Sequence, residues 1–427
     1  MTTVHARNPL RERGAAALFV VVMLCFAMVL VVALAQRNLV VEEQRSANEL
    51  RSRTAFAAAD AGLEWALARI NDPTPIGATC LPSTDPAATS FRLRLLRIDA
   101  ASGAVTPTTW NDAGSTVPLQ AACVRGAAGW TCSCPASGRP TLSAVDGGAL
   151  APAFFVELAA SPRPGVVGVV AIGCTKAAAA TGCAAADASG REATARVETA
   201  WALLPTLRSE PVAALTVGGD LDVGAAALGV ANVDATSGGL AVHAGGRVLA
   251  TALRIDAPAG ASLAGSIASD DEELRELGFE RLFARHFGMP PRVWAAQPAA
   301  RHVVCADNCA ASIVAAVAGG ARLVFVDGDA ALEGPAVLGS ADDPIALVAS
   351  GTLAIAGNVA VHGIVHAAAL DWRNGTAGVA FVHGALVVAG DARGNAAADV
   401  VRDAAILDRL ANASGSFVRV NGSWKDF

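Results

Sequence analysis

The stretch that decides the fold is RERGAAALFVVVMLCFAMVLVVALA, residues 11–35, in which no charged residue follows Arg13. An α-helix over its uncharged part, residues 15–35, would reach about 30 Å, enough to cross the hydrocarbon core of a bilayer. Arg7, Arg11 and Arg13 precede this run, and basic residues beside a membrane span favour the cytoplasmic side. The sequence therefore predicts a single-pass membrane topology, with a cytoplasmic N-terminus and the rest of the chain on the other side of the membrane.

The helical pattern continues beyond the apolar run into VEEQRSANELRSRTAFAAADAGLEWALARIN, residues 41–71. Large apolar residues recur there at the spacing of one helix face: Phe56, Leu63, Leu67 and Ile70. Pro73 ends the helix, because the residue before a proline disfavours the α conformation. We therefore expect one helix over residues 15–72, transmembrane at 15–35 and amphipathic at 36–71.

Two interpretations of this N-terminus, a cleaved signal peptide and an uncleaved anchor, fit on physical grounds. Ala33-Leu34-Ala35 has the small residues of a secretory signal-peptidase site, and cleavage there would release a soluble protein. Against this, the apolar run exceeds the roughly 7–15 residues of an ordinary signal peptide, and the helical pattern does not stop after it. An uncleaved anchor with a helical stalk is equally compatible with the segment's hydrophobicity.

The motif Arg11-Glu12-Arg13-Gly14, directly before the apolar run, resembles the leader of type IV prepilins, and residues 41–71 are similar to the N-terminal region of PilX-type minor pilins. The resemblance covers residues 11–71, about one-seventh of the chain. It implies that residues 1–14 are a leader and that prepilin peptidase cuts after Gly14, leaving Ala15 as the new N-terminus.

The same resemblance implies a function. A minor pilin of a Gram-negative type IV pilus takes part in pilus assembly, by initiating or capping the filament, and a large exported region is available for cell adhesion. The implied partners are other minor pilins, the major pilin and a tip adhesin. The resemblance also implies that residues 15–35 span the inner membrane, that the C-terminal region is periplasmic, and that the subunit is incorporated in a surface pilus. No nucleic-acid partner is expected, because the net charge of −6 provides no basic stripe.

One position departs from the family pattern and keeps an alternative open. Most pilins carry glutamate at the fifth mature position, where this chain has Phe19. A buried carboxylate without its partner costs several kcal/mol, so its absence suits a filament tip, where no neighbour offers an amine. The type II secretion pseudopilin of the K type shows a similar loss. A membrane-anchored carbohydrate-binding surface protein is the third reading, and seven tryptophans without any tyrosine count against it.

The cysteines indicate an oxidising compartment. Eight of the nine follow the apolar run, which itself contains Cys25, and an even set on the exported side predicts disulfides. Sequence nearness predicts two local bonds, Cys174–Cys183 and Cys305–Cys309. Four cysteines remain, whose pairing the spacing does not determine: Cys80, Cys123, Cys132 and Cys134. Because Cys132 and Cys134 share one strand face, each is expected to pair with Cys80 or Cys123 rather than with the other.

No catalytic motif is present: the sequence lacks a G-x-S-x-G elbow, a P-loop and an H-E-x-x-H helix. His362, His366 and His383 lie in Val-, Gly- and Ala-rich segments, and His383 repeats the Val-His-Gly context of His362, which favours matching positions on stacked coils over a metal site. Four aspartates next to or near glycines are typical of turns rather than of calcium sites: Asp220, Asp222, Asp327 and Asp329. We therefore expect no enzyme activity, cofactor or metal.

The exported part divides into two regions of different pattern. Residues 73–208 contain short strand candidates separated by turns, which predict a small antiparallel, pilin-like sheet packed on the helix. One candidate is FRLRLLRID, residues 91–99, which opens with alternating apolar and charged residues. Residues 209–427 repeat short Val/Leu/Ala runs with intervening glycines, which favours a β-solenoid of the right-handed β-helix kind over a β-sandwich. Ser269 and Glu272 form a capping box for one inserted helix, expected to cover an end of the coil stack. The predicted class is α+β.

Overall fold

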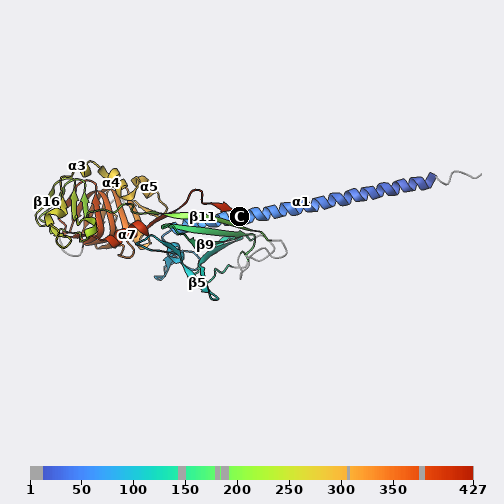
Figure 1. The fold of residues 1–427 in the computed structure, drawn as a ribbon, viewed down its shortest axis with the longest axis horizontal. Helices are drawn as coiled ribbons and strands as arrows, with labels where there is room; N and C mark the ends of the chain where they lie inside the picture. The colour runs from blue at the N-terminus through green and yellow to red at the C-terminus, as the bar shows by residue number, and fades with distance from the viewer. Residues whose placement is uncertain are drawn as a thin grey trace, which may run out of the picture.

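The computed structural model describes residues 13–142, 151–177, 183, 192–304, 308–374 and 380–426. It combines a long N-terminal apolar helix with two large sheets, one antiparallel and one parallel (Figure 1). The antiparallel sheet adjoins the helix, and the parallel sheet forms the end of the molecule farthest from the N-terminus. The mixed helix-and-sheet class expected from the sequence is therefore observed.

Helix α1 (Arg13–Asn71) is continuous over 59 residues, which corresponds to about 88 Å at 1.5 Å per residue. Its first half projects away from the rest of the molecule, and its second half lies against the antiparallel sheet (Figure 1). The helix ends at Asn71, and Asp72 Oδ1 then accepts a hydrogen bond from the Thr74 amide (3.0 Å), which closes a turn around Pro73. The expected helix over residues 15–72 thus corresponds to α1.

The antiparallel sheet has seven strands, in the order β28-β11-β10-β9-β7-β8 with β29 also paired to β11. The bounds are β7 (Gln120–Gly126), β8 (Gly129–Ser133), β9 (Ala153–Ala160), β10 (Val166–Cys174), β11 (Thr194–Pro205), β28 (Gly415–Arg419) and β29 (Lys425–Asp426). Burial alternates along β10, so that Val167, Val169 and Ala171 are buried in the core shared with α1. Alternation of this kind is what one covered sheet face requires.

A close approach fixes the helix on this sheet. A Cβ at Gly173 would lie 2.1 Å from the Ala55 carbonyl oxygen and 2.4 Å from the Ala59 amide nitrogen, both in α1. Gly62 of α1 is matched in the same way to Phe154, whose ring carbons would lie 2.9 Å from an added Cβ. Glycine on each partner therefore allows backbone and ring contacts that no other residue would allow.

Short elements connect α1 to the sheet. They are β1 (Pro75–Ile76), β2 (Thr89–Ser90), α2 (Phe91–Leu95), β3 (Leu96–Ile98), β4 (Val105–Pro107), β5 (Thr109–Asp112) and β6 (Ser115–Pro118). Residues 91–99 were expected to begin as a strand, but Phe91–Leu95 is helical because the Ser90 side chain accepts a hydrogen bond from the Leu93 amide and caps a turn.

The second sheet contains sixteen strands, and each of its ladders between described residues is parallel. The first group is β12 (Leu215–Val217), β13 (Leu221–Gly224), β14 (Gly229–Ala231), β15 (Val242–Ala244), β16 (Val248–Ala250), β17 (Arg254–Asp256) and β18 (Ile267–Ala268). The second group is β19 (Ala300–Val303), β20 (Leu323–Val326), β21 (Ala330–Glu333), β22 (Ala336–Leu338), β23 (Ile345–Ala356), β24 (Val359–Arg373), β25 (Phe381–Val388), β26 (Ala392–Gly394) and β27 (Asp399–Arg402). Two short 3-10 turns interrupt the first group, η1 (Ala235–Ser237) and η2 (Leu263–Ser266).

These two groups meet in the middle of the sheet. Strand β12 pairs on one side with β15 and on the other with β25. Leu215 of β12 is the register partner of Leu386 of β25, although the two strands are far apart in the sequence. From β12 the chain runs through β15 to β18 at one end of this series of paired strands. It then continues at the opposite end with β19 and runs through β20, β23 and β24 back to β25, beside β12. Neighbouring strands in space are not all neighbours in sequence.

More than one helix accompanies the parallel sheet, which corrects the expectation of a single inserted helix. The segment expected as one helix, which begins at Ser269, is divided into α3 (Glu272–Arg275) and α4 (Gly278–Phe287). Three further helices occur among the described residues: α5 (Pro291–Ala295), α6 (Ala310–Ala318) and α7 (Ala404–Asn412). The N-cap is Asp271, whose side chain accepts a hydrogen bond from the Leu274 amide (3.2 Å), rather than Ser269. The division occurs because Gly278 has a φ of 62°.

The helices cover different surfaces of the sheet. Phe283 and Phe287 of α4 pack with Ile364 and Val387 on the outer face of β24 and β25, so α4 lies along the flank. In contrast, Ile313 of α6 belongs to the core cluster enclosed by the strands. The helix expected at an end of the strand stack is therefore on its flank, and α6 contributes to the core between the strands instead. The strands under α4 are buried on both faces, which explains why residues 345–349 are uniformly apolar.

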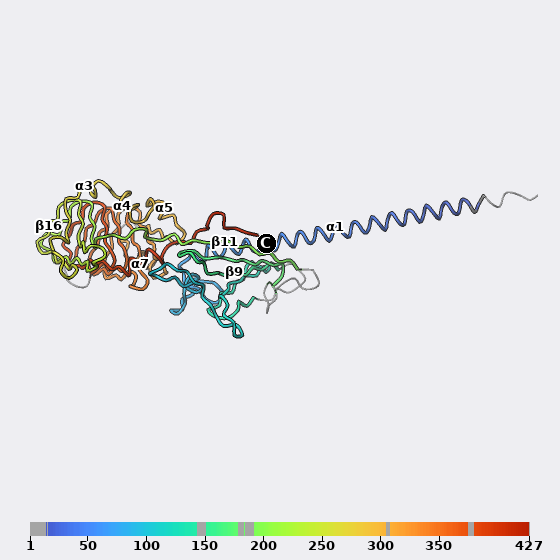
Figure 2. The backbone as a smooth tube through the Cα atoms, in the orientation of Figure 1, coloured from blue at the N-terminus to red at the C-terminus, as the bar shows by residue number. Residues whose placement is uncertain are grey.

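The parallel sheet and helices α3–α7 are together called the parallel body. In sequence, this body is inserted between two neighbouring strands of the antiparallel sheet, β11 and β28. Strand β11 ends at Pro205, which pairs with Gly415 of β28, and the Thr206 amide donates to the Ser414 carbonyl (3.0 Å). Figure 2 shows the C-terminal segment returning beside β11 toward α1. The expected region 209–427 therefore does not lie wholly in the parallel body, because residues 415–426 complete the antiparallel sheet.

Candidate functional site: the exposed N-terminal helix and its attachment

The first half of α1 has an apolar surface that no described residue covers. Side chains from Leu18 to Val41 are exposed, with Phe19 at 65% and Val29 at 67%. Among the described residues, α1 is the one helix long and apolar enough to cross a membrane, by length and composition. An isolated surface of this size in water would be strongly unfavourable, so it requires lipid or other apolar helices around it.

The predicted cleavage residues lie at the start of this helix. Gly14 is exposed, and a Cβ added there would meet nothing within 4 Å. Ala15 follows within α1, and Cys25 is an exposed free thiol of the apolar run. The first carboxylate after Gly14 is Glu42, so residues 15–41 contain no acidic group that could pair with a neighbouring N-terminal amine.

The second half of α1 is held by residues far away in the chain. Asn71 donates from its side-chain nitrogen to the Phe417 carbonyl (2.9 Å) and accepts from the Phe417 amide (2.7 Å). Arg92 donates to the Ile70 carbonyl (2.9 Å) and to the Gly415 carbonyl (2.7 Å), with its guanidinium 5.1 Å from the Phe417 ring centre. Burial lowers the pKa of Arg92 to about 10, so the group remains charged at neutral pH.

The end of the chain also contacts the helix. Trp424 and Phe56 pack edge to face with ring centres 6.1 Å apart, and Arg419 forms an ion pair with Glu64. These contacts show why Phe56 appeared in the predicted helix face although it is only partly covered. Trp424 thus packs on α1.

Three disulfides join described cysteines. The structure brings together Cys174 and Cys183, Cys80 and Cys134, and Cys123 and Cys132, with Cα atoms 5.5, 5.2 and 4.0 Å apart. Cys132 and Cys134 therefore take different partners, as their positions on one strand face suggested. For the remaining predicted pair, Cys305 lies outside the described residues.

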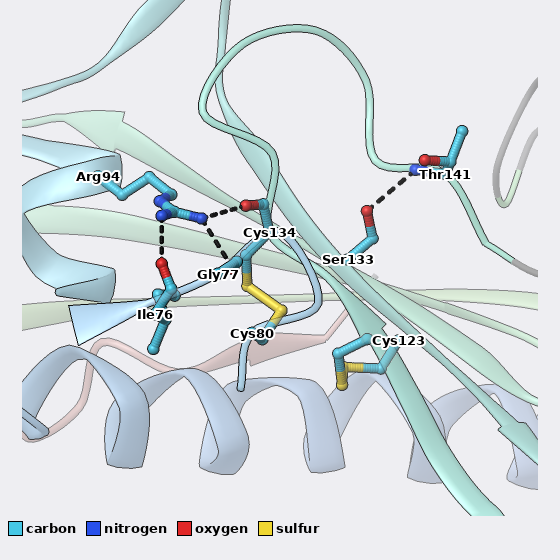
Figure 3. Close-up of a disulfide and its surroundings, with 9 residues drawn as sticks. Ile76, Gly77, Cys80, Arg94, Cys123, Ser133, Cys134 and Thr141 are labelled. Carbon is cyan, nitrogen blue, oxygen red and sulfur yellow. Dashed lines mark hydrogen bonds between the residues drawn. A yellow bond between two sulfur atoms is a disulfide. The ribbon is translucent and has the colours of Figure 1, made fainter. Parts of the chain in front are cut away.

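Arg94 reinforces the Cys80–Cys134 link. Its guanidinium donates to the carbonyls of Gly77 (2.9 Å) and Cys134 (2.6 Å) and also to that of Ile76 (Figure 3). Partial burial lowers the pKa of Arg94. The arginine and the disulfide connect the loop after α1 with the end of β8, a pairing that no local sequence signal indicates.

The histidines do not form a metal site among the described residues. His362 and His383 are register partners on the adjacent parallel strands β24 and β25, so their shared Val-His-Gly context corresponds to matching strand positions. His366 is fully buried, with ring centres of Phe279 and Phe283 at 5.1 and 5.2 Å. Burial lowers the pKa of His366 to about 3, so the ring is neutral at physiological pH.

Three of the predicted turn aspartates link adjacent segments of the parallel sheet. Asp220 Oδ1 accepts from the Arg247 amide (2.9 Å), and Asp329 Oδ1 accepts from the Thr352 amide (2.6 Å). Asp327 Oδ1 instead accepts from the Ser350 hydroxyl of β23 (2.9 Å), while Asp222 lies on β13. A carboxylate satisfied in this way acts as backbone support.

No protein-family model and no curated protein matches this chain. Among solved structures, the crystal structure of the competence-associated pilin ComZ from Thermus thermophilus matches at 11% identity and a TM-score of 0.22, covering 88% of this chain and 97% of that one. At this TM-score the two folds do not superimpose closely, and the likeness adds nothing to what the residues themselves indicate.

Proposed function

We propose that this chain is a minor-pilin-like subunit of a type IV pilus, anchored in the inner membrane by Ala15–Ala35 and added to a filament through that segment. The observation that carries the proposal is the half-covered helix: one half is apolar and exposed, and the other half is packed on an antiparallel sheet. Such a helix can exchange lipid for neighbouring apolar helices without unfolding the sheet. The motif ending at Gly14 supplies the cleavage position.

The exported region has a structural role in this proposal and no catalytic one. We propose that the parallel body is a β-solenoid, because each of its ladders joins strands in parallel and apolar side chains fill the space between them. Disulfides support a periplasmic or surface location. Other minor pilins, the major pilin and a tip adhesin are the proposed partners, with pilus initiation or capping and adhesion as the roles.

A type II secretion pseudopilin of the K type is the second candidate, because Phe19 occupies the position where most pilins carry glutamate. Both candidates use the same processing and the same helix. They are distinguished by isolation of sheared surface pili: a minor pilin is recovered with the pilus fraction, whereas a pseudopilin remains in the cell envelope with the secretion apparatus.

The proposed function predicts the mature N-terminus. Expressed with a prepilin peptidase, the chain should begin at Ala15 by mass spectrometry, and Gly14→Phe should leave the precursor uncut because the peptidase requires a small residue there. Ala33→Phe is the matched control, since it removes a signal-peptidase site and should leave cleavage after Gly14 unchanged. A mature chain that begins at Gln36 would refute the pilin proposal.

A further inference from the structure

A groove of about 620 Å³ lies where the end of α1 meets the parallel body. This volume is within the range of roughly 300–1,000 Å³ typical of ligand clefts. Residues 72–74 after α1 form one side, strand β19 forms the floor, and one face of α6 forms the other side. The pilus proposal makes no use of this groove, which is remote from the exposed half of α1.

The floor of the groove is an open sheet edge. Strand β19 pairs in parallel with β20 and with no other strand among the described residues, and Ala300–Val303 line the groove. An edge strand has backbone amides and carbonyls that point away from its one partner. An extended peptide could therefore add to this edge by main-chain hydrogen bonds.

The wall opposite β19 allows a backbone to approach closely. The groove-lining residues of α6 are small: Ser312, Ala315, Ala316 and Gly319. Ser312 and Ala315 are exposed, whereas Ile313 and Val317 are buried in the core and the exposed Val314 does not line the groove. A slot between a strand edge and a helix of small residues suits an extended chain better than a helix, which is about 10 Å wide.

The charge of the groove favours an acidic occupant. Arg301 on β19 is exposed and forms no ion pair with a described residue, whereas Asp72 on the other side is paired with Arg69 (3.4 Å). His302, next to Arg301, stacks on Phe325 with ring centres 5.4 Å apart. The uncompensated charge at the rim is therefore positive, and it complements a carboxylate side chain.

From the open edge, the small-residue wall and the unpaired arginine, we propose that this groove binds an extended acidic peptide segment of a partner protein as an added strand beside β19. Main-chain hydrogen bonds hold the peptide, and Arg301 selects for acidic side chains.

The test uses the full chain in detergent micelles and a short fluorescein-labelled peptide in which valine and glutamate alternate. Fluorescence anisotropy should show saturable binding, about tenfold weaker for the same peptide with lysine in place of glutamate. Arg301→Glu should reverse that preference. A peptide with proline at alternate positions, which lacks the amides, should not bind.

Two matched variants locate the binding site. Ala315→Phe should fill the groove and abolish binding, whereas Ala318→Phe, on an exposed part of α6 that does not line this groove, should not affect it. Thermal unfolding by circular dichroism checks that both variants fold. Absence of saturable binding, equal binding of the lysine peptide, or binding unchanged by Ala315→Phe would overturn the proposal. A self-association that Ala315→Phe abolishes would also overturn it, in favour of a second copy as the occupant.

Discussion

At the scale of single residues, one glycine and one histidine allow close packing within the antiparallel sheet region and within the parallel body, respectively. Gly173 admits the α1 backbone against β10, and His366 fills a space between the phenylalanines of α4 and the strands beneath them. Neither ring nitrogen of His366 has a hydrogen-bond partner among the described residues. The effects of Gly173 and His366 are on stability, and each can be measured.

Gly173→Ala should destabilise the chain. The added Cβ would lie 2.1 Å from the Ala55 carbonyl oxygen, so α1 must shift, and overpacking of this kind typically costs about 1–3 kcal/mol. Gly126→Ala is the control, because its Cβ would meet only the Gly129 carbonyl oxygen at 3.9 Å. Urea unfolding followed by circular dichroism measures both variants, and equal loss in the two would show that the helix adjusts freely.

His366 should make stability depend on pH. Because burial lowers its pKa from 6.5 to about 3, the unfolded chain takes up a proton below pH 6.5 that the folded chain does not. This contribution to stability is present above pH 6.5 and is lost as the pH falls toward 3. Relative to His366→Leu, the wild-type chain should lose about 1.4 kcal/mol per pH unit between pH 6 and pH 4.

Urea unfolding at several pH values gives this slope. His286 contributes a similar dependence in both chains, because burial lowers its pKa to about 4, and so it cancels in the difference. A difference between His366→Leu and wild type that does not change with pH would contradict the buried, neutral state of His366.

At the scale of elements, the sequence pattern predicted the features that neighbouring residues determine, such as the covered face of a helix, but not the contacts between distant segments. The 3.6-residue spacing of Leu63 and Ile70 predicted the covered face of α1, and both are 1% exposed. Residues 91–95 were misjudged, because alternation suggested a strand while the Ser90 cap favoured a helical turn. Disulfide partners such as Cys80 and Cys134 could not be chosen from spacing, since their meeting depends on how the loop after α1 returns to β8.

The two disulfides beside α1 should differ in their contribution. Cys80–Cys134 closes a loop of 54 residues and Cys123–Cys132 one of 9, so the chain-entropy relation gives about 4 and about 2.5 kcal/mol. Replacing each pair by alanines should therefore lower the free energy of unfolding more for the first pair. Urea unfolding compares the two double variants, and a larger loss for Cys123–Cys132 would indicate that local packing outweighs loop closure.

At the scale of the whole molecule, the insertion is the feature that the sequence did not reveal. The repeated strand pattern after residue 209 was visible, but nothing local distinguishes β28 from the strands before it. Its pairing with β11 joins residues 205 and 415, and only the complete core, in which Phe417 is 1% exposed, favours that contact. The groove between the two bodies could not be predicted for the same reason.

Because the insertion begins and ends at hydrogen-bonded neighbours, the antiparallel sheet should fold without it. Thr206 and Ser414 are already paired, so an Asn-Gly turn joining them would complete a two-residue β-hairpin between β11 and β28. A chain lacking residues 207–413 should keep Phe417 in the core and both Asn71 hydrogen bonds, unfold cooperatively, and remain in the membrane fraction. A chain that stops at Arg208 is the comparison: it loses β28, leaves the Asn71 side chain without those partners, and should melt at a lower temperature. Circular dichroism melts of the two shortened chains decide the matter. If both melt alike, β28 contributes nothing to the sheet, and the parallel body is an appendage rather than an insertion held at both ends.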